Sequence, residues 1–299
     1  MASGSNRKNS KNALINNLMI KKITIVGIGL MGGSLAMQCR SKGIAAHIIG
    51  VDENPEHASD ALSMHLVDEV LPLDDAIATS DVIVLTVPMN ALVGLLPSVL
   101  DKVKQQVVLD MGSTKNILAK SVDAHANRGR FVATHPMWGT EYSGPRAAVE
   151  GAFENKAVIL CDTEKTDADA LDFVKDLYRK LNMHIIEMNA VDHDLHAAYV
   201  SHISHITSFA LANTVLEKER EDKAIFEMAS AGFESTVRLA KSNPDMWTPI
   251  LMQNKDNVLD VLNEHISQLR KFKSCLEKEN WDYLKELMLH ANQIKRIIQ

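Results

Sequence analysis

Residues 21–32 read KKITIVGIGLMG, an apolar β-branched run that ends in three spaced glycines. A run of this kind predicts a parallel strand that is covered on both faces. The glycines match the pattern G-x-G-x-x-G, and a helix is predicted directly after them, near 32–42. The stretch therefore predicts the first strand, turn and helix of a Rossmann-type dinucleotide-binding domain.

Each glycine of this loop has an expected task. Gly27 permits the tight turn, Gly29 lets a pyrophosphate approach the backbone, and Gly32 lets the helix pack close to the strand. Leu30 and Met31 are expected to present free backbone N–H groups at the start of the helix, where the helix dipole favours a phosphate. The alternative is a glycine turn in an α/β fold that binds no nucleotide.

An acidic pair after the second predicted strand indicates the cofactor. Asp52 follows Gly32 by 20 residues and is expected to accept hydrogen bonds from the adenosine ribose hydroxyls. Glu53 stands next to it, so a 2′-phosphate would meet two carboxylates. The pattern favours NAD over NADP.

Strands and helices alternate through the first two thirds of the chain and then give way to helices. The predicted strands are 21–29, 47–52, 81–88, 105–112, 130–136, 157–161 and 184–188, and the helices lie near 32–42, 55–65, 90–103, 115–127 and 166–181. Alternation of this kind predicts a doubly wound parallel sheet with helices on both faces. Apolar positions recur every three or four residues in 259–272 and 281–294, which predicts amphipathic helices. The fold class is α/β, and we expect a tail in 1–18 that is disordered, an NAD-binding domain in 19–189 and an all-α substrate and dimerisation domain in 190–299.

Composition narrows the function classes. The 299 residues carry 38 acidic and 32 basic side chains, a net charge of -6 that disfavours a nucleic-acid partner. The three cysteines form no C-x-x-C pair, so neither a disulfide framework nor a cysteine zinc site is indicated. No apolar run reaches the ~18 residues of a membrane span, and 1–18 lacks the apolar core of a secretory signal. We expect a cytoplasmic protein with no membrane partner.

Loops at the carboxyl ends of the predicted strands supply candidate chemistry, because ligands of doubly wound sheets bind there. Val87 and Pro88 are expected to line the cofactor. Ser113 lies in DMGSTK, where it would cap the helix that starts near Lys115, take part in catalysis, or do both. His135 ends a strand just before a proline. A neutral imidazole there would accept a proton from a substrate hydroxyl, although a lone histidine is often structural.

The helical half adds two clusters. Ser201, His202 and His205 follow one another at helical spacing, so the two histidines share a helix face. A metal site is disfavoured, because no cysteine or third ligand is indicated; we predict no metal. In FESTVRLAKSNPDMW (233–247), Arg238 would offer a bidentate fork to a carboxylate, with a surface arginine as the alternative.

Together these pieces resemble the prephenate/arogenate dehydrogenase family. The stretches that carry the resemblance are GIGLMGGSLA, DMGSTK, HPMWGTEYSG, DHDLHAAYVSHISH and STVRLAKSNPDMW, which occur in the family's order from about residue 20 to the C-terminus. The resemblance implies a Rossmann domain followed by an all-α domain that forms a homodimer. It also implies NAD-dependent oxidative decarboxylation of prephenate to 4-hydroxyphenylpyruvate, or of arogenate to tyrosine.

Carried over by position, His135 resembles the catalytic histidine that hydrogen-bonds the ring 4-hydroxyl. Ser113 resembles the serine that orients this histidine and the nicotinamide. His205 and Arg238 resemble the histidine and arginine that bind substrate. Ser201, His202 and Trp247 match further family positions, and we expect them at the substrate site.

Other readings stay open at the sequence level. Prephenate and arogenate differ only in a keto or amino group, and Glu141 would favour the ammonium of arogenate if it faces the substrate. A β-hydroxyacid dehydrogenase shares G-x-G-x-M-G, but the glycine-rich run before its catalytic lysine is missing around Lys241. A non-catalytic NAD-binding regulator would not need His135 and Arg238 together.

Overall fold

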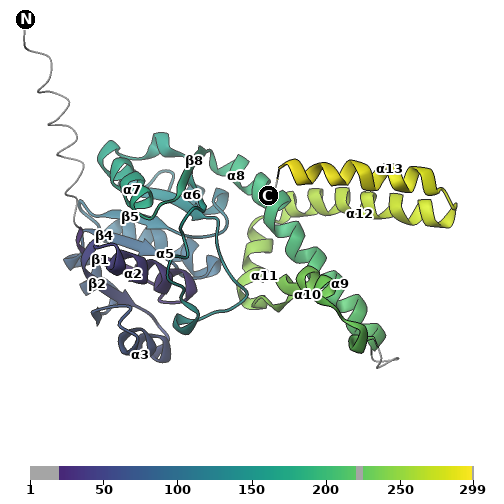
Figure 1. Cartoon of the computed structure of the whole chain (residues 1–299). Helices are drawn as coiled ribbons and strands as arrows, with labels where there is room; N and C mark the ends of the chain where they lie inside the picture. Colours follow the sequence, from purple (N-terminus) through teal and green to yellow (C-terminus); the bar gives the residue numbers. More distant parts are fainter. Residues whose placement is uncertain (1–19, 220–224, 298–299) are drawn as a thin grey trace, which may run out of the picture.

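The computed structural model describes residues 20–219 and 225–297; the tail expected in 1–18 lies outside the described residues. One eight-stranded sheet forms the first part, in the order β3-β2-β1-β4-β5-β6-β7-β8. Its strands are β1 (Ile20–Val26), β2 (Ala45–Val51), β3 (Glu69–Val70), β4 (Val82–Leu85), β5 (Val107–Asp110), β6 (Phe131–Pro136), β7 (Ala157–Cys161) and β8 (His184–Met188). Figure 1 shows this sheet wrapped by helices.

One pair of strands departs from the predicted parallel sheet. β7 runs antiparallel to β6, while every other neighbouring pair is parallel. A parallel return needs a crossover, usually a helix, and the segment 137–156 holds only the short 3₁₀ turn η2 (Pro145–Ala147). β7 therefore starts at the edge where β6 ends, and segment 137–156 stays at that edge.

Side chains that alternate along the strands pack into two hydrophobic cores, one on each face of the sheet. Ile23 and Ile25 of β1 pack into the core beneath α2 (Leu30–Ser41) and α7 (Ala168–Lys180). Ile83 and Leu85 of β4 pack into the opposite core with α5 (Met89–Lys102) and α6 (Asn116–Ser121). The doubly wound arrangement predicted from the alternation is thus confirmed.

Several element limits differ from the predictions. β4 and β5 end two or three residues early, at Leu85 and Asp110, and the freed residues form loops. Helix α3 (Pro55–Ser63) agrees closely with its prediction, whereas the helix expected in 115–127 shortens to α6 and a turn. The short elements β3 and α4 (Leu73–Thr79) were not predicted, because they span too few residues to show a period.

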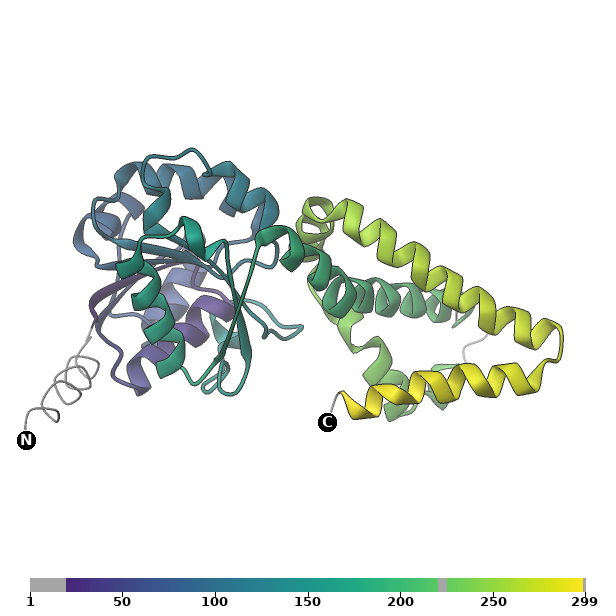
Figure 2. The same cartoon turned by 90° about the horizontal axis from the view of Figure 1, so that it is seen from above.

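Every described element after β8 is helical, as predicted. The helices are α8 (Ala190–Ala197), α9 (Ile203–Glu219), α10 (Ala231–Val237), α11 (Pro244–Gln253), α12 (Lys255–Glu277) and α13 (Trp281–Ala291), with a π-helical segment η4 (Ala198–His202) between α8 and α9. The α12–α13 hairpin projects away from the sheet (Figures 1 and 2). Among the described residues, no helix is long and apolar enough to span a bilayer.

Two helical segments anchor this second part to the first. Ala190 of α8 and Trp247 and Ile250 of α11 are buried in the same core as α5 and α6. Gln253 adds polar contacts: its amide donates to the Met89 carbonyl over 2.9 Å, and its Oε1 accepts from Thr114 Oγ1 over 2.6 Å. The edge of the sheet and the start of the helical part are therefore held together.

The glycine loop yields a first prediction. A Cβ built on Gly32 would lie 2.2 Å from the Gly27 carbonyl oxygen, whereas one on Gly29 meets no atom within 4 Å. We expect Gly32→Ala to lower the free energy of unfolding by about 1–3 kcal/mol, since backbone must move. Gly29→Ala serves as the matched control and should unfold as the wild type does. Equal unfolding midpoints in urea for all three proteins would contradict the close packing.

Candidate active site

The carboxyl ends of β1, β4, β5 and β6 meet at one edge of the sheet because these strands are parallel. The loops that leave this edge carry the glycines, Val87 and Pro88, the 111–116 segment and His135. Helices α8 and α11 pack against the same region. Most sequence-predicted site residues are thus gathered here.

The glycine loop has the form that a dinucleotide requires. Gly27 adopts φ +92°, a left-handed conformation that favours glycine, and its ideal Cβ would touch Thr86 at 2.9 Å. Thr86 Oγ1 donates to the Gly27 carbonyl over 2.5 Å and ties the β4 loop to the turn. Among the described residues, no atom would lie within 4 Å of a Cβ on Gly29, and no side chain caps the start of α2. The N–H groups at Leu30 and Met31 can therefore meet a phosphate.

Asp52 lies just beyond β2 and fixes the shape of this loop. Its Oδ2 accepts from the Ile28 N–H over 2.7 Å, and its Oδ1 accepts from the Asn54 N–H over 2.9 Å. The carboxylate keeps further lone pairs for ribose hydroxyls. The residues present therefore fit a dinucleotide.

A buried ion pair shapes the loop after β5. Asp110 and Lys115 are both fully buried, and Lys115 Nζ contacts Asp110 Oδ2 directly. The two carboxylate oxygens also accept from the backbone N–H groups of Thr134 and Gly112, over 3.0 and 2.8 Å. Removing one partner from such a buried pair is strongly destabilising, because the other charge is left without compensation. The pair therefore links the ends of β5 and β6, next to His135.

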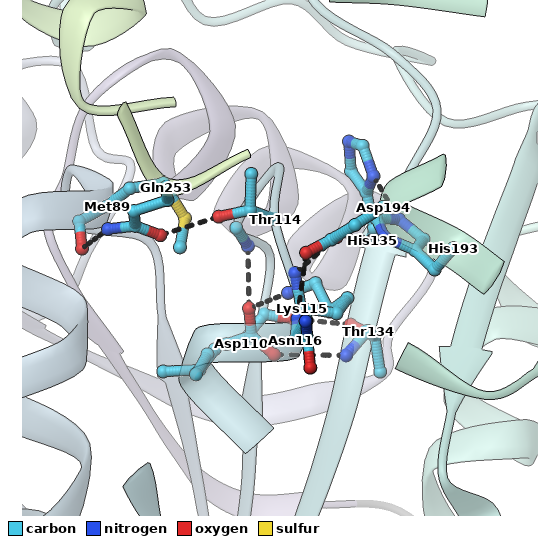
Figure 3. Close-up of polar contacts among 12 residues, drawn as sticks. Met89, Asp110, Thr114, Lys115, Asn116, Thr134, His135, His193, Asp194 and Gln253 are labelled. Atoms are coloured by element: carbon cyan, nitrogen blue, oxygen red, sulfur yellow. Dashed lines mark hydrogen bonds and ion pairs between the residues drawn. The ribbon is translucent and has the colours of Figure 1, made fainter. Parts of the chain in front are cut away.

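His135 is almost fully buried at the end of β6, with 9% of its surface exposed. Its Nδ1 lies 2.8 Å from Nε2 of His193 on α8 (Figure 3). Burial holds the pKa of His135 well below its ordinary value, and electrostatic interactions with His193, Lys115 and His202 act in the same direction. The imidazole is therefore neutral at physiological pH, as a proton acceptor must be.

The cap of α6 is not the one considered from the sequence. The backbone N–H groups of Lys115 and Asn116 donate to the carboxylate of Asp194, over 2.7 and 2.9 Å. Ser113 is half-buried and makes no side-chain hydrogen bond within the described part of the chain, so it neither caps the helix nor hydrogen-bonds to His135. A carboxylate from α8 satisfies both donors better than one hydroxyl. A role of Ser113 toward the nicotinamide stays a prediction.

The two histidines of the helical part lie against one aromatic ring. His205 stacks on Trp247 with ring centroids 3.5 Å apart, and His202 meets the same ring edge-on at 5.9 Å. Burial lowers the pKa of His202 to about 4 and also lowers that of His205. Ser201 and His202 belong to the π-helical segment, a feature often found at functional sites. His205 Nδ1 donates to the Ser201 carbonyl over 3.0 Å, so a neutral ring keeps Nε2 as an acceptor.

Arg238 forms an ion pair with the first part of the chain. Its Nη1 lies 3.1 Å from Glu141 Oε2, and its side chain is 51% exposed. A backbone hydrogen bond and the guanidinium of Arg238 hold the pKa of Glu141 below its ordinary value. The other N–H groups of the Arg238 guanidinium are available to a further carboxylate. The antiparallel β6–β7 connection is what brings Glu141 to this edge.

Several polar residues of this region were not assigned from the sequence: Asp110, Lys115, Thr134, Tyr178, His193, Asp194 and Asn254. Asp110 and Lys115 both lie in the stretch DMGSTK. An acid and a base five residues apart in a strand-end loop was the one sign in the sequence that they could pair. Asn254 was not detectable, because only the packing of α11 and α12 brings it to His202, over 3.1 Å. In the described residues, no three histidine, cysteine or acidic side chains gather as metal ligands would.

Comparisons with family models and with known proteins point to the same family. Residues 35–187 match the family model for the prephenate dehydrogenase nucleotide-binding domain, and residues 189–290 match the model for the prephenate dehydrogenase dimerization domain. The chain is 32% identical to a prephenate dehydrogenase of Bacillus subtilis, over 90% of this chain and 73% of the relative.

Solved structures similar to this chain include members of the same family. The chain resembles prephenate dehydrogenase from A. aeolicus in complex with hydroxyphenyl propionate and NAD+, with a TM-score of 0.83, 31% identity, and coverage of 94% of this chain and 99% of that one. It also resembles Synechocystis arogenate dehydrogenase, with a TM-score of 0.75, 27% identity, and coverage of 93% and 100%.

Proposed function

The chain belongs to the prephenate dehydrogenase family, and on that premise we propose that it converts prephenate to 4-hydroxyphenylpyruvate in tyrosine biosynthesis. Enzymes of this family are oxidoreductases with a nucleotide-binding domain. The observation that carries the proposal is a buried, neutral histidine, His135, at the same edge of the sheet as an open glycine loop. Prephenate, NAD+ and the enzyme would give 4-hydroxyphenylpyruvate, CO₂ and NADH.

NAD is the cofactor that suits this loop. When bound, NAD+ supplies the acceptor for the hydride that leaves the ring carbon of the substrate. Gly27, Gly29 and Gly32 with the start of α2 would hold its pyrophosphate, and Asp52 would hold the ribose. Val87 lies against the turn: its Cγ1 is 3.0 Å from the ideal Cβ of Gly27.

His135 would act on the substrate hydroxyl. Its Nδ1 is engaged by His193, so Nε2 is the nitrogen left for the substrate. Nε2 takes the hydroxyl proton as the carbinol carbon becomes a carbonyl. Loss of the ring carboxylate as CO₂ then leaves its electron pair in an aromatic ring, and the phenolate oxygen takes the proton back from His135. No net proton is released.

Arg238 would anchor a carboxylate of the substrate, with His205 Nε2 and Trp247 nearby as further contacts. Glu141 is already paired with Arg238, which reduces its attraction for the ammonium of arogenate. This pairing favours prephenate as the substrate. Arogenate dehydrogenase activity is the second candidate, supported by the resemblance to the Synechocystis enzyme.

The exposed apolar surface of α12 and α13 supports a homodimer formed through the helical part. Large apolar side chains are 47–57% exposed along both helices: Leu259, Leu269, Leu276, Trp281, Met288 and Leu289. Patches of this kind mark protein interfaces. All three cysteines are free and buried, which suits a cytoplasmic enzyme.

Gly29→Ala tests the cofactor site. The variant should weaken NAD+ binding about tenfold, because its new methyl group occupies the space for the pyrophosphate. Titration of protein fluorescence with NAD+ measures the dissociation constant. An unchanged dissociation constant would place the cofactor elsewhere.

His135→Asn tests the proton acceptor. We expect turnover to fall about 10²–10⁴-fold, as loss of a general base predicts, with NAD+ affinity near normal. His184→Asn, at an exposed histidine of β8, is the matched control and should keep wild-type turnover. NADH absorbance gives the rates, and full turnover by His135→Asn would rule out this role.

Arg238→Gln tests the carboxylate anchor. Charge-assisted hydrogen bonds contribute about 1.5–3 kcal/mol, so the KM for prephenate should rise roughly 10–100-fold with less effect on kcat. Lys241→Gln, in the same 3₁₀ segment η6 (Arg238–Lys241), controls for loss of surface charge. A loss confined to kcat would argue against anchoring.

A further inference from the structure

A chain of hydrogen bonds leads from His135 into the protein, through residues to which the proposed reaction assigns no task. His135 Nδ1 lies 2.8 Å from His193 Nε2, and His193 Nδ1 lies 2.8 Å from Asp194 Oδ1 (Figure 3). His193 and Asp194 are each 2% exposed. Both belong to α8, so the helical part of the chain supports a histidine of the sheet.

The carboxylate at the end of this chain is fixed as an acceptor. Asp194 Oδ1 accepts from the Lys115 N–H over 2.7 Å, and Oδ2 accepts from the Asn116 N–H over 2.9 Å. These donors form the start of α6, where the backbone dipoles favour a negative charge. An ionised carboxylate has no proton to give, so His193 Nδ1 must carry the hydrogen of their shared bond.

The remaining protons follow from this constraint. When the His193 ring carries a single hydrogen, on Nδ1, its Nε2 has a lone pair. His135 Nδ1 must then be the donor in the bond between the two rings, and His135 Nε2 is left without a proton. Burial opposes a second proton on the His135 ring and lowers its pKa, and electrostatic interactions with His193, Lys115 and His202 act in the same direction.

We propose that His193 and Asp194 are positioning residues, which hold His135 in the tautomer protonated on Nδ1 with Nε2 free to accept the substrate hydroxyl proton. The inference rests on the proposed function of His135. In the reaction, the substrate O–H bond breaks and an N–H bond forms at Nε2, while Asp194 stabilises the resulting imidazolium through His193 without taking the proton. The opposite tautomer has a hydrogen on Nε2 and cannot accept.

The backbone carbonyl of Asp194 also ties the base to the placement of α8. Asn254 Nδ2 donates to the Asp194 backbone carbonyl over 2.7 Å and to His202 Nδ1 over 3.1 Å. α8 is thereby held from the side of α11 and α12 as well as from α6. A shift of α8 would move the acceptor away from His135 and release its tautomer.

The hydrogen-bonded chain of His135, His193 and Asp194 is called the relay. Nitrogen NMR of the wild-type protein tests the tautomer of His135 with the relay intact. The full chain, labelled with ¹⁵N in its histidine rings and saturated with NAD+, should show His135 and His193 both protonated on Nδ1 at neutral pH. Loss of signals in His135→Asn assigns the ring. A proton on Nε2 of His135, or on both nitrogens of His193, would overturn the proposal.

Paired substitutions of His193 test its effect on catalysis. His193→Leu removes the acceptor, and turnover should fall about 10²-fold, the loss expected from a misplaced catalytic group. His193→Gln places an amide oxygen near the position of Nε2 and should recover most of that loss. The KM for prephenate and the NAD+ dissociation constant should stay within about twofold in both. His196→Gln, at an exposed histidine of the same helix, is the control.

The outcomes separate the relay from the reaction itself. Equal losses in His193→Leu and His193→Gln, or wild-type turnover in His193→Leu, would overturn the relay. If the wild-type protein forms no NADH from prephenate or arogenate, the proposed function fails even when the NMR tautomer is as expected. If His135→Asn keeps full turnover, the role of His135 as proton acceptor fails. If His135→Asn is inactive but the wild-type ring carries its proton on Nε2, the relay and proton acceptance at Nε2 both fail, while the proposed overall reaction stands.

Discussion

One carboxylate, that of Asp194, joins the two parts of this molecule. It accepts the N–H groups at the start of α6 and the ring of His193, and it is buried where water cannot replace those bonds. An unpaired charge there would cost several kcal/mol, so α6, α8 and His135 can keep only a narrow range of relative positions. The cofactor edge of the sheet and the helical part are fixed together by this constraint.

A second buried interaction, the ion pair of Asp110 and Lys115, holds the loop whose backbone N–H groups donate to Asp194. It joins the loop after β5 to strand β6, through the Thr134 N–H. The polar interior of the site is therefore continuous from β5 to α8. Apolar packing of Trp247 and Ile250 against the α5 side of the sheet closes it from α11.

The sequence predicted the fold well where the pattern was long. The β1 strand, the glycine turn and the alternation up to β8 followed from periodicity, and so did the helical second part. The antiparallel β7 was not predicted, because apolar runs carry no sign of strand direction. The short β3 and α4 were missed for lack of length. Motifs pointed to His135 and Arg238 as site residues, and their roles stay predictions. The contacts that tune it, such as Asp194 to α6 and Asn254 to His202, join segments 52–79 residues apart and arise only from packing.

The most direct test of the central claim is the rate of NADH formation from NAD+ by the purified chain, with prephenate and arogenate in parallel. The account predicts rapid NADH formation with prephenate, accompanied by CO₂ and 4-hydroxyphenylpyruvate, and much slower formation with arogenate. Turnover of arogenate alone would contradict the substrate assignment. Binding of NAD+ with no NADH from either compound would contradict the proposed reaction.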